Sequence, residues 1–232
     1  MAASSLETLL QHPALWRGDD LARVAQPSLA TGFAALDRAL PGGGWPVGAL
    51  TELLHEREGV GELRLLAPAL ARLTREGRWV AWVTPPHLPY APALAAAGIQ
   101  LSRLLVIGKT TLRDNLWAAE QALRAGSMGA VLFWPSDIDS RAARRLQLAA
   151  EAGGAAGFLY RPLRAAEQAS PAALRIVLEA QGDELSLRLL KRRGAPATAA
   201  IRLRLAKSLV FPGREGRRPA ASSFSPGQAW HA

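Results

Sequence analysis

Short apolar runs alternate with amphipathic segments through the middle of the chain. Runs of this kind are typical of strands that are buried on both faces of a parallel sheet. Strands are expected at residues 49–55, 79–84, 104–107, 129–134 and 156–160. The segments between them place apolar residues three and four positions apart, which predicts helices. These helices are expected at residues 61–75, 90–97, 112–125 and 140–152.

The alternation predicts an α/β fold, with a mostly parallel sheet flanked by helices. The pattern then changes to a two-residue period at 174–180, 184–190 and 201–205, with no helix between these segments. Such a period predicts half-buried antiparallel strands, with Gly182-Asp183 as the first turn. The C-terminal strands are therefore expected to form an antiparallel meander.

The ends of the chain differ from its middle. Residues 5–11 and 31–40 predict two short helices, and Pro68 is expected to kink the helix at 61–75 or delay its start. The expected organisation is an N-terminal helical segment at 1–27, a core domain at 28–210 and a disordered basic tail at 211–232. With hydrophobic residues at 49% of 232, the chain can bury a sizeable core.

The composition excludes several kinds of site. There is no cysteine, so a disulfide scaffold or a thiolate metal site is excluded. The four histidines are scattered without metal-ligand spacing, and neither a metal nor a cofactor is expected. No apolar run is long enough to span a membrane, and the N-terminal residues lack the basic start of a signal peptide. The expected location is the cytoplasm of a bacterium.

Positive charge is concentrated near the C-terminus. The formal net charge is +9, and from Lys191 onward nine basic residues face a single acidic one, Glu215. Such asymmetry favours contact with nucleic acid or with an acidic protein surface, although a solvated tail remains an alternative. Trp230 is a candidate anchor for a partner or for stacking on a base. The candidate partner-binding residues are Lys191, Arg192, Arg193, Arg202, Arg204, Lys207, Arg214, Arg217, Arg218 and Trp230.

Two features of the predicted helices receive a structural interpretation. Arg141, Arg144 and Arg145 form a basic helix face, for which solvation is favoured over binding. Trp117 occupies what is expected to be a buried position of its helix, together with Leu116 and Leu123.

A phosphate-binding loop is expected between the first core strand and the next helix, but its functional residues are missing. Gly59 and Gly61 provide some backbone freedom. Glu62 stands where the motif needs a lysine, and Leu63 stands where it needs a hydroxyl group. A carboxylate beside a triphosphate reverses an interaction worth about 4 kcal/mol at an effective dielectric of about 20. Ordinary ATP binding is therefore not expected.

The run TGFAALDRALPGGGWPVGALTELL at 31–54 resembles the segment that leads into the ATP-binding core of the RecA recombinase family. More narrowly, it is similar to the ImuA family, which belongs to a RecA-like group together with the division inhibitor SulA. The resemblance covers about residues 28–208 and implies a RecA-like core. It also implies lost catalysis, because Pro86 stands in place of the catalytic glutamate and Trp134-Pro135 in place of the Mg²⁺-binding aspartate. No catalytic residue is expected.

The ImuA resemblance implies a non-enzymatic scaffold in SOS-induced translesion DNA synthesis. The implied partners are ImuB, indirectly the catalytic subunit of an error-prone replicative polymerase, and also RecA, or DNA through the basic tail. Nucleoid association during DNA damage would follow. Two alternatives stay open: a SulA-like division inhibitor that binds FtsZ, and a RecA-like ATPase with a non-standard phosphate loop.

Overall fold

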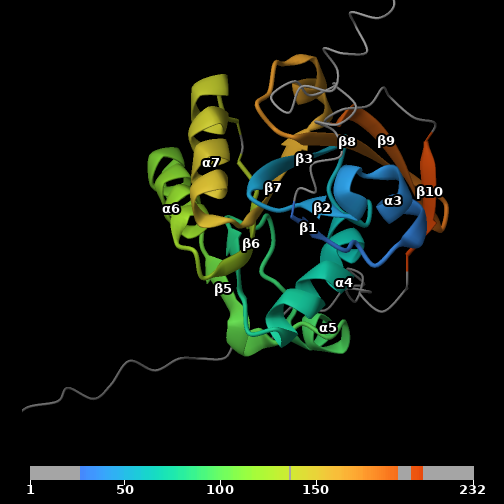
Figure 1. Ribbon diagram of the computed structural model, residues 1–232, viewed down its shortest axis with the longest axis horizontal. Helices are drawn as coiled ribbons and strands as arrows, with labels where there is room; N and C mark the ends of the chain where they lie inside the picture. Colours follow the sequence, from blue (N-terminus) through green and yellow to red (C-terminus); the bar gives the residue numbers. More distant parts are fainter. Residues whose placement is uncertain (1–26, 136, 193–199, 206–232) are drawn as a thin grey trace, which may run out of the picture.

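One large sheet forms the centre of the molecule (Figure 1). The computed structural model describes residues 27–135, 137–192 and 200–205. The eight strands follow the order β10-β9-β8-β3-β7-β6-β4-β5. The strands from β8 to β5 pair in parallel, whereas β9 and β10 are antiparallel to their neighbours. The expected mostly parallel sheet with C-terminal antiparallel strands is confirmed.

The strand boundaries lie close to the expected ones. The large sheet consists of β3 (Ala49–His55), β4 (Trp79–Val83), β5 (Leu104–Ile107), β6 (Met128–Phe133), β7 (Ala156–Pro162), β8 (Leu174–Gln181), β9 (Glu184–Arg192) and β10 (Ile201–Arg204). A separate pair, β1 (Ser28–Leu29) with β2 (Trp45–Pro46), was not expected from the sequence. All seven residues of β3 are buried, as expected of a central strand, although Thr51, Glu52 and His55 are polar.

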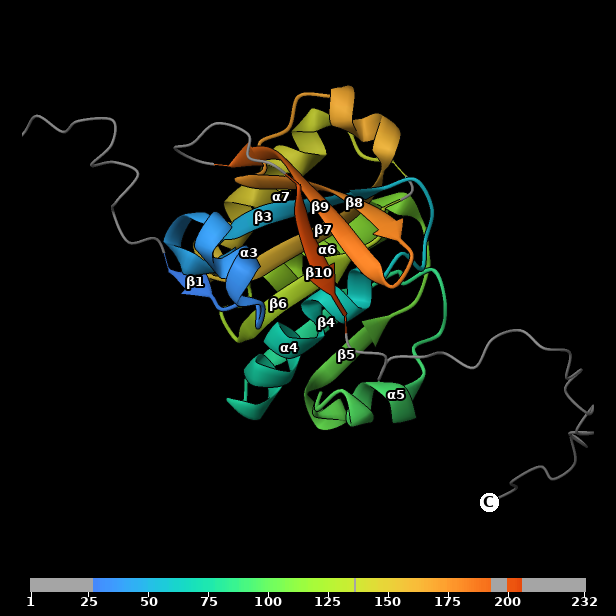
Figure 2. The same ribbon diagram turned by 90° about the vertical axis from the view of Figure 1, so that its right-hand side faces the viewer.

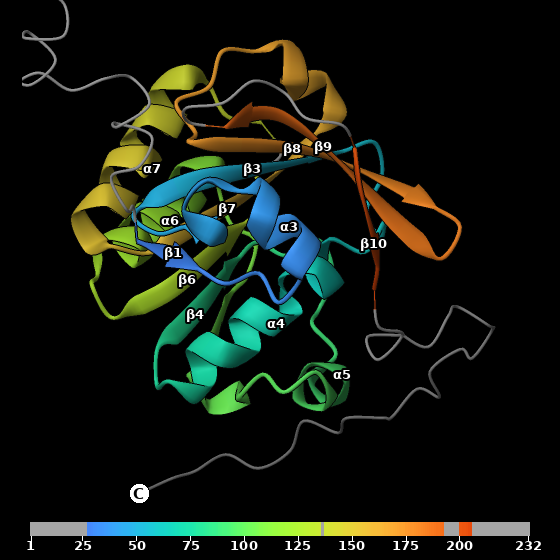
Figure 3. The same ribbon diagram turned by 45° about the vertical axis from the view of Figure 1, so that its right-hand side comes forward.

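Helices cover both faces of the sheet. The helices are α3 (Ala34–Ala39), α4 (Glu62–Arg75), α5 (Ala91–Ala96), α6 (Leu112–Arg124) and α7 (Ser140–Gly153). Short 3-10 turns lie at η1 (Pro41–Gly43), η2 (Leu101–Arg103) and η3 (Leu163–Glu167). Helices α6 and α7 lie together on one face, and α3, α4 and α5 lie on the other (Figure 1). Figures 2 and 3 show β10 beside α3, at the opposite end of the sheet from β5.

Three expected helices differ in detail. Helix α4 begins at Glu62 and continues through Pro68, so the expected late start does not occur. Helix α3 begins at Ala34 rather than at residue 31, because Thr31 forms local bonds instead: its Oγ1 accepts from the amide of Phe33 at 3.0 Å. In α6, Trp117 is 61% exposed, and its expected burial is wrong. Its position lies opposite the helix stripe that contains the buried Ala119, Ala122 and Leu123.

The expected helix at 5–11 and the expected tail disorder fall outside the described residues. Among the described residues, no helix is long and apolar enough to cross a membrane.

A buried ionic cluster joins the three middle strands on the α6–α7 side. Glu52 of β3 is fully buried, and its two oxygens accept from Arg161 of β7 at 3.0 Å and from Arg175 of β8 at 2.7 Å. Ser170 adds a hydroxyl bond to the same carboxylate at 2.7 Å. The Arg175 Nη2 atom also donates to the carbonyl of Ala165 in η3 at 2.6 Å. The carboxylate is thus hydrogen-bonded at both oxygens within the fold, and the cluster carries one more cation than anion.

We expect Arg175→Met to lower the free energy of unfolding by about 1–3 kcal/mol, because it leaves one oxygen of a buried carboxylate without its hydrogen-bond partner. The double variant Glu52→Gln/Arg175→Met should lose less than the sum of its two single variants. Urea denaturation measures both effects. Arg188→Met, at an exposed position of β9, is the control, and a cost equal to that of Arg175→Met would contradict the prediction.

Close contact between α6 and α7 depends on Gly153 in the last turn of α7. A Cβ atom at this position would lie 2.0 Å from the carbonyl oxygen of Leu123 and 2.9 Å from the Cα of Arg124. Both neighbours are backbone atoms, so the contact cannot be relieved by a side-chain rotation. The two helices therefore approach as closely as they do because residue 153 has no side chain.

Gly153→Ala should therefore separate the helices and destabilise the protein by about 1–3 kcal/mol. The matched control is Gly108→Ala, because a Cβ atom at Gly108 meets nothing within 4 Å. Thermal unfolding followed by circular dichroism measures both variants. Equal melting temperatures for the two would show that the helices tolerate the added methyl group.

Candidate functional site

The loop between β3 and α4 is closed by the side chain of Glu62. Its carboxylate accepts from the amide of Gly59 at Oε1 and from the amide of Gly61 at Oε2, both at 2.9 Å. Gly61 precedes the helix with φ 108°, and Glu62 is buried. In this loop the protein's own anion occupies the backbone amides that would otherwise be offered to an external anion. Gly59 and Gly61 lie in the loop between β3 and α4, whereas Glu62 and Leu63 are the first two residues of α4. That this segment is a degenerate phosphate loop stays a prediction.

Aromatic side chains fill the space beside this loop. Tyr160 of β7 is buried and stacks on Trp134 with ring centroids 4.4 Å apart, and Trp134 also contacts Trp82 of β4. Burial and, to a smaller extent, the negative charge of Glu62 raise the pKa of the Tyr160 hydroxyl well above 10.0. His55, at the end of β3, lies with its ring centroid 6.3 Å from that of Tyr160. Tyr160 is thus held in its neutral form.

An open pocket of about 430 Å³ lies next to the aromatic residues. The loops after β4, β5 and β6 surround it. Its lining residues are Glu58, Thr84, Pro85, Pro86, Lys109, Leu112, Asn115, Phe133, Trp134 and Pro135. Crevices of this kind, at the carboxyl ends of parallel strands, are the usual ligand sites of open α/β sheets. Pro86 and Trp134-Pro135, expected in place of two catalytic carboxylates, line this one pocket together.

Thr84 has a strained backbone conformation and hydrogen-bonds to the ends of β5 and β6. Its φ is 53°, in the left-handed region that β-branched residues avoid. Its amide donates to Ile107 at 2.8 Å, and its hydroxyl donates to the carbonyl of Trp134 at 3.0 Å. Asn115 is buried and accepts from the amide and hydroxyl of Thr110. Thr84 and Asn115 thus bond to neighbouring groups of the chain, whereas the ring nitrogens of His55 and the hydroxyl of Tyr160 have no hydrogen-bond partner among the described residues. Within the described ranges, no group of three or more acidic or histidine side chains could hold a metal ion.

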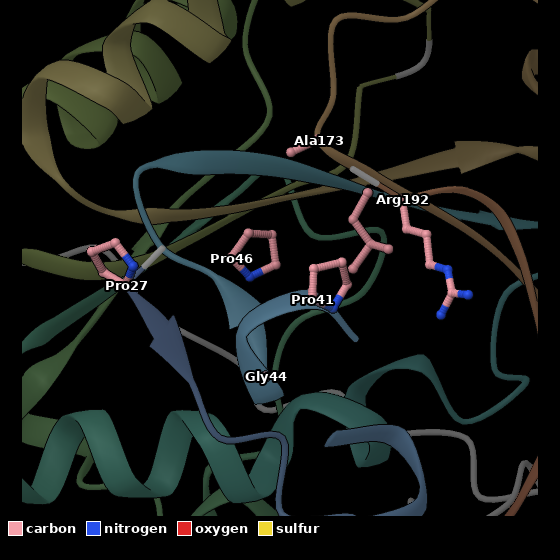
Figure 4. Close-up of a pocket in the computed structure, with 7 residues that line it drawn as sticks. Pro27, Pro41, Gly44, Pro46, Ala173 and Arg192 are labelled. Carbon is pink, nitrogen blue, oxygen red and sulfur yellow. The ribbon is translucent and has the colours of Figure 1, made fainter. Parts of the chain in front are cut away.

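A second, much smaller cavity lies near η1, as Figure 4 shows. Pro27, Pro41 and Pro46 line it, together with Arg192 from β9. Its volume of about 20 Å³ holds no more than a single water molecule. It is a packing gap between β1, η1 and the sheet and not a ligand site.

Four of the basic residues predicted to bind a partner lie in the described part of the chain, two on β9 and two on β10. Lys191 and Arg192 belong to β9, where they donate to the carbonyls of Ser170 at 2.9 Å and Ala39 at 2.7 Å. Arg202 and Arg204 are exposed on β10, and Arg204 pairs with Glu184 at 3.1 Å. The remaining members lie outside the described residues, namely Arg193, Lys207, Arg214, Arg217, Arg218 and Trp230.

The structure also reveals features that the sequence analysis missed. The cluster of Glu52, Arg161 and Arg175 is one of them, although a glutamate in an otherwise apolar strand is a signal for a buried ion pair. The second feature is the outward face of α6 and α7, which carries Trp117 and Leu148, exposed by 61% and 46% respectively. Of these two side chains, the exposed tryptophan is the stronger signal for a protein-binding surface, because tryptophan is enriched in protein interfaces.

Comparison with known proteins relates this chain to division inhibitors. A family model described as "Cell division inhibitor SulA" matches residues 48–157, from the start of β3 into β7. SulA of Serratia proteamaculans is 31% identical over 117 residues, which cover 50% of this chain and 70% of that protein. SulA of Edwardsiella piscicida is 34% identical over 98 residues, or 42% of this chain and 58% of that protein.

These matches overturn the narrower interpretation of the sequence. The expected membership of the ImuA family is wrong, because both the family model and the relatives carry the name of SulA. The partners and the process implied by the ImuA resemblance are therefore also wrong. The partners are ImuB, the error-prone polymerase subunit, RecA and DNA, and the process is translesion synthesis. The run at 31–54 misled because most of it precedes the segment that matches SulA.

The relatives are named for inhibition and not for catalysis, in agreement with the expectation of a non-enzymatic protein. The first of these relatives matches at 31% identity over more than two thirds of its own length. The protein belongs to the SulA family of cell division inhibitors.

Proposed function

We propose that this protein inhibits cell division by binding the division protein FtsZ, in the cytoplasm and without an enzymatic step. The observation that carries the proposal is the match to SulA over residues 48–157, which contain the loop, the pocket and helices α4 to α7. The filled loop supports it, because Glu62 satisfies the amides of Gly59 and Gly61 from within the chain.

The proposal is tested by expressing the protein in a rod-shaped bacterium without DNA damage. We expect the cells to grow into filaments, because division stops while growth continues. In vitro, the purified protein at a concentration equal to that of FtsZ should reduce GTP-dependent FtsZ assembly, measured by sedimentation and light scattering. Normal division at verified soluble expression, with unchanged FtsZ assembly, would contradict the proposal.

The degenerate phosphate loop is a second part of the proposal. That the sheet is a RecA-like core stays a prediction, which the position of the loop between β3 and α4 supports. Within that prediction, nucleotide binding is lost at several places at once. They include Leu63 in place of a hydroxyl group, and Pro86 and Pro135 in the pocket beside the loop.

Neither the natural protein nor Glu62→Lys should therefore bind a fluorescent ATP analogue in the presence of Mg²⁺. The lysine supplies one charge but restores neither the hydroxyl group nor a carboxylate for the metal ion. Fluorescence anisotropy measures the binding, with a nucleotide-binding protein as the positive control. Micromolar affinity for the natural protein would overturn this part and favour an ATPase.

A further inference from the structure

The open pocket of about 430 Å³ lies between two neighbouring strands whose connections leave on opposite faces of the sheet. Helix α5, which follows β4, lies on one face, and α7, which follows β6, lies on the other (Figure 1). The loops after these strands therefore diverge, and such a switch point is the usual ligand position in an open α/β sheet. Thr84 and Pro86 line the pocket from one loop, and Trp134 and Pro135 line it from the other. The volume also falls within the range of small-molecule sites, about 300–1,000 Å³.

The walls of this pocket are held in place before any ligand binds. The ring of Trp134 stacks on Tyr160 with an angle of 5° between the rings, and it also contacts Trp82. The three prolines of the wall, at positions 85, 86 and 135, have a fixed φ. Thr84 keeps a φ of 53° through its bonds to the ends of β5 and β6, and strain of this kind gathers at functional sites. Walls that are already ordered bind a flat apolar group with little further loss of side-chain freedom.

The pocket has one charged side chain at each end. Lys109 follows the edge strand β5, whereas Glu58 follows β3, on the other side of β4, β6 and β7 in the strand order. Within the described part of the chain, Lys109 has no hydrogen bond or ion pair. Next to it, the buried Asn115 forms three hydrogen bonds of 2.7–3.3 Å with Thr110, which fix the backbone. Glu58 lies 3.4 Å from the imidazole of His87. The ammonium group of Lys109 can therefore pair with a ligand.

We propose that this pocket binds a small aromatic molecule with a single negative charge. The rings of the ligand pack against Trp134 and the prolines, and its acidic group pairs with Lys109. Glu58 disfavours a second negative charge at the other end, because like charges at short distance repel. The same repulsion separates this ligand class from nucleoside triphosphates, which carry several negative charges. The inference is independent of the proposed function, because the pocket belongs to this chain alone.

The test measures the binding of three probes to the full chain by isothermal titration calorimetry. Naphthoate has both the rings and the charge, naphthamide has the rings without the charge, and acetate has the charge without the rings. We expect a dissociation constant of about 1 mM or lower for naphthoate. Naphthamide and acetate should each bind about fivefold more weakly or worse, because each lacks one of the two contacts.

Variants assign the binding to the two ends of the pocket. Lys109→Gln should weaken naphthoate about fivefold and leave naphthamide unchanged, because only naphthoate has a charge to pair. Glu58→Gln should strengthen the binding of naphthalene dicarboxylate about threefold or more, because it removes the opposing charge. The matched control is Arg113→Gln, which removes an exposed cation from the first turn of α6, outside the lining of the pocket. It should change each affinity by less than about twofold.

Nuclear magnetic resonance of the nitrogen-labelled protein locates the ligand. The indole signal of Trp134, identified by its loss in Trp134→Phe, should shift with naphthoate, whereas that of the exposed Trp117 should not. Absence of naphthoate binding would overturn the inference, and so would equal losses in Lys109→Gln and Arg113→Gln. Naphthamide binding as tightly as naphthoate would show an apolar patch in place of a site for an acid. Tighter binding of ATP than of naphthoate would overturn the ligand class.

Discussion

A single buried carboxylate organises the middle of the sheet. Glu52 lies on the central strand with no solvent contact, so the fold must supply positive charge from its neighbours. Arg161 comes from β7 on one side and Arg175 from β8 on the other, and Arg175 also holds η3 through the carbonyl of Ala165. Any shift in the register of either strand would move a guanidinium away from the carboxylate. The ionic cluster therefore specifies the arrangement of three strands and one connection.

Internal hydrogen bonds also fix the carboxyl edge of the same sheet, beside the open pocket. Glu62 bonds to two amides of its own loop, and Thr84 bonds to the strand ends on both sides of β4. Tyr160 and Trp134 stack where an open α/β sheet usually leaves room for a ligand. Glu62 and Thr84 thus hydrogen-bond within the chain at the edge where enzymes of this architecture place their catalytic groups. The family to which it belongs is named for inhibition, which needs a surface and not a reaction centre.

Much of the fold follows from local patterns in the sequence. The apolar run at β6 predicts a buried strand and the two-residue period at β9 predicts an antiparallel strand, and the structure agrees with both predictions. The pair of β1 and β2 was missed because two residues carry no period. Trp117 was misplaced because its neighbour Leu116 is apolar as well, and one helical position changes the facing direction by about 100°. The cluster around Glu52 depends on contacts across more than one hundred positions, which no local pattern contains.

The position of the arginines in this cluster has a further consequence for how the family segment relates to the folded protein. The match to the SulA family model ends at residue 157, whereas both partners of Glu52 lie beyond it. A fragment cut at that boundary would strand an uncompensated charge in its interior and leave one side of β3 without β8. The residues matched by the family model therefore do not by themselves supply the cations that this buried carboxylate needs.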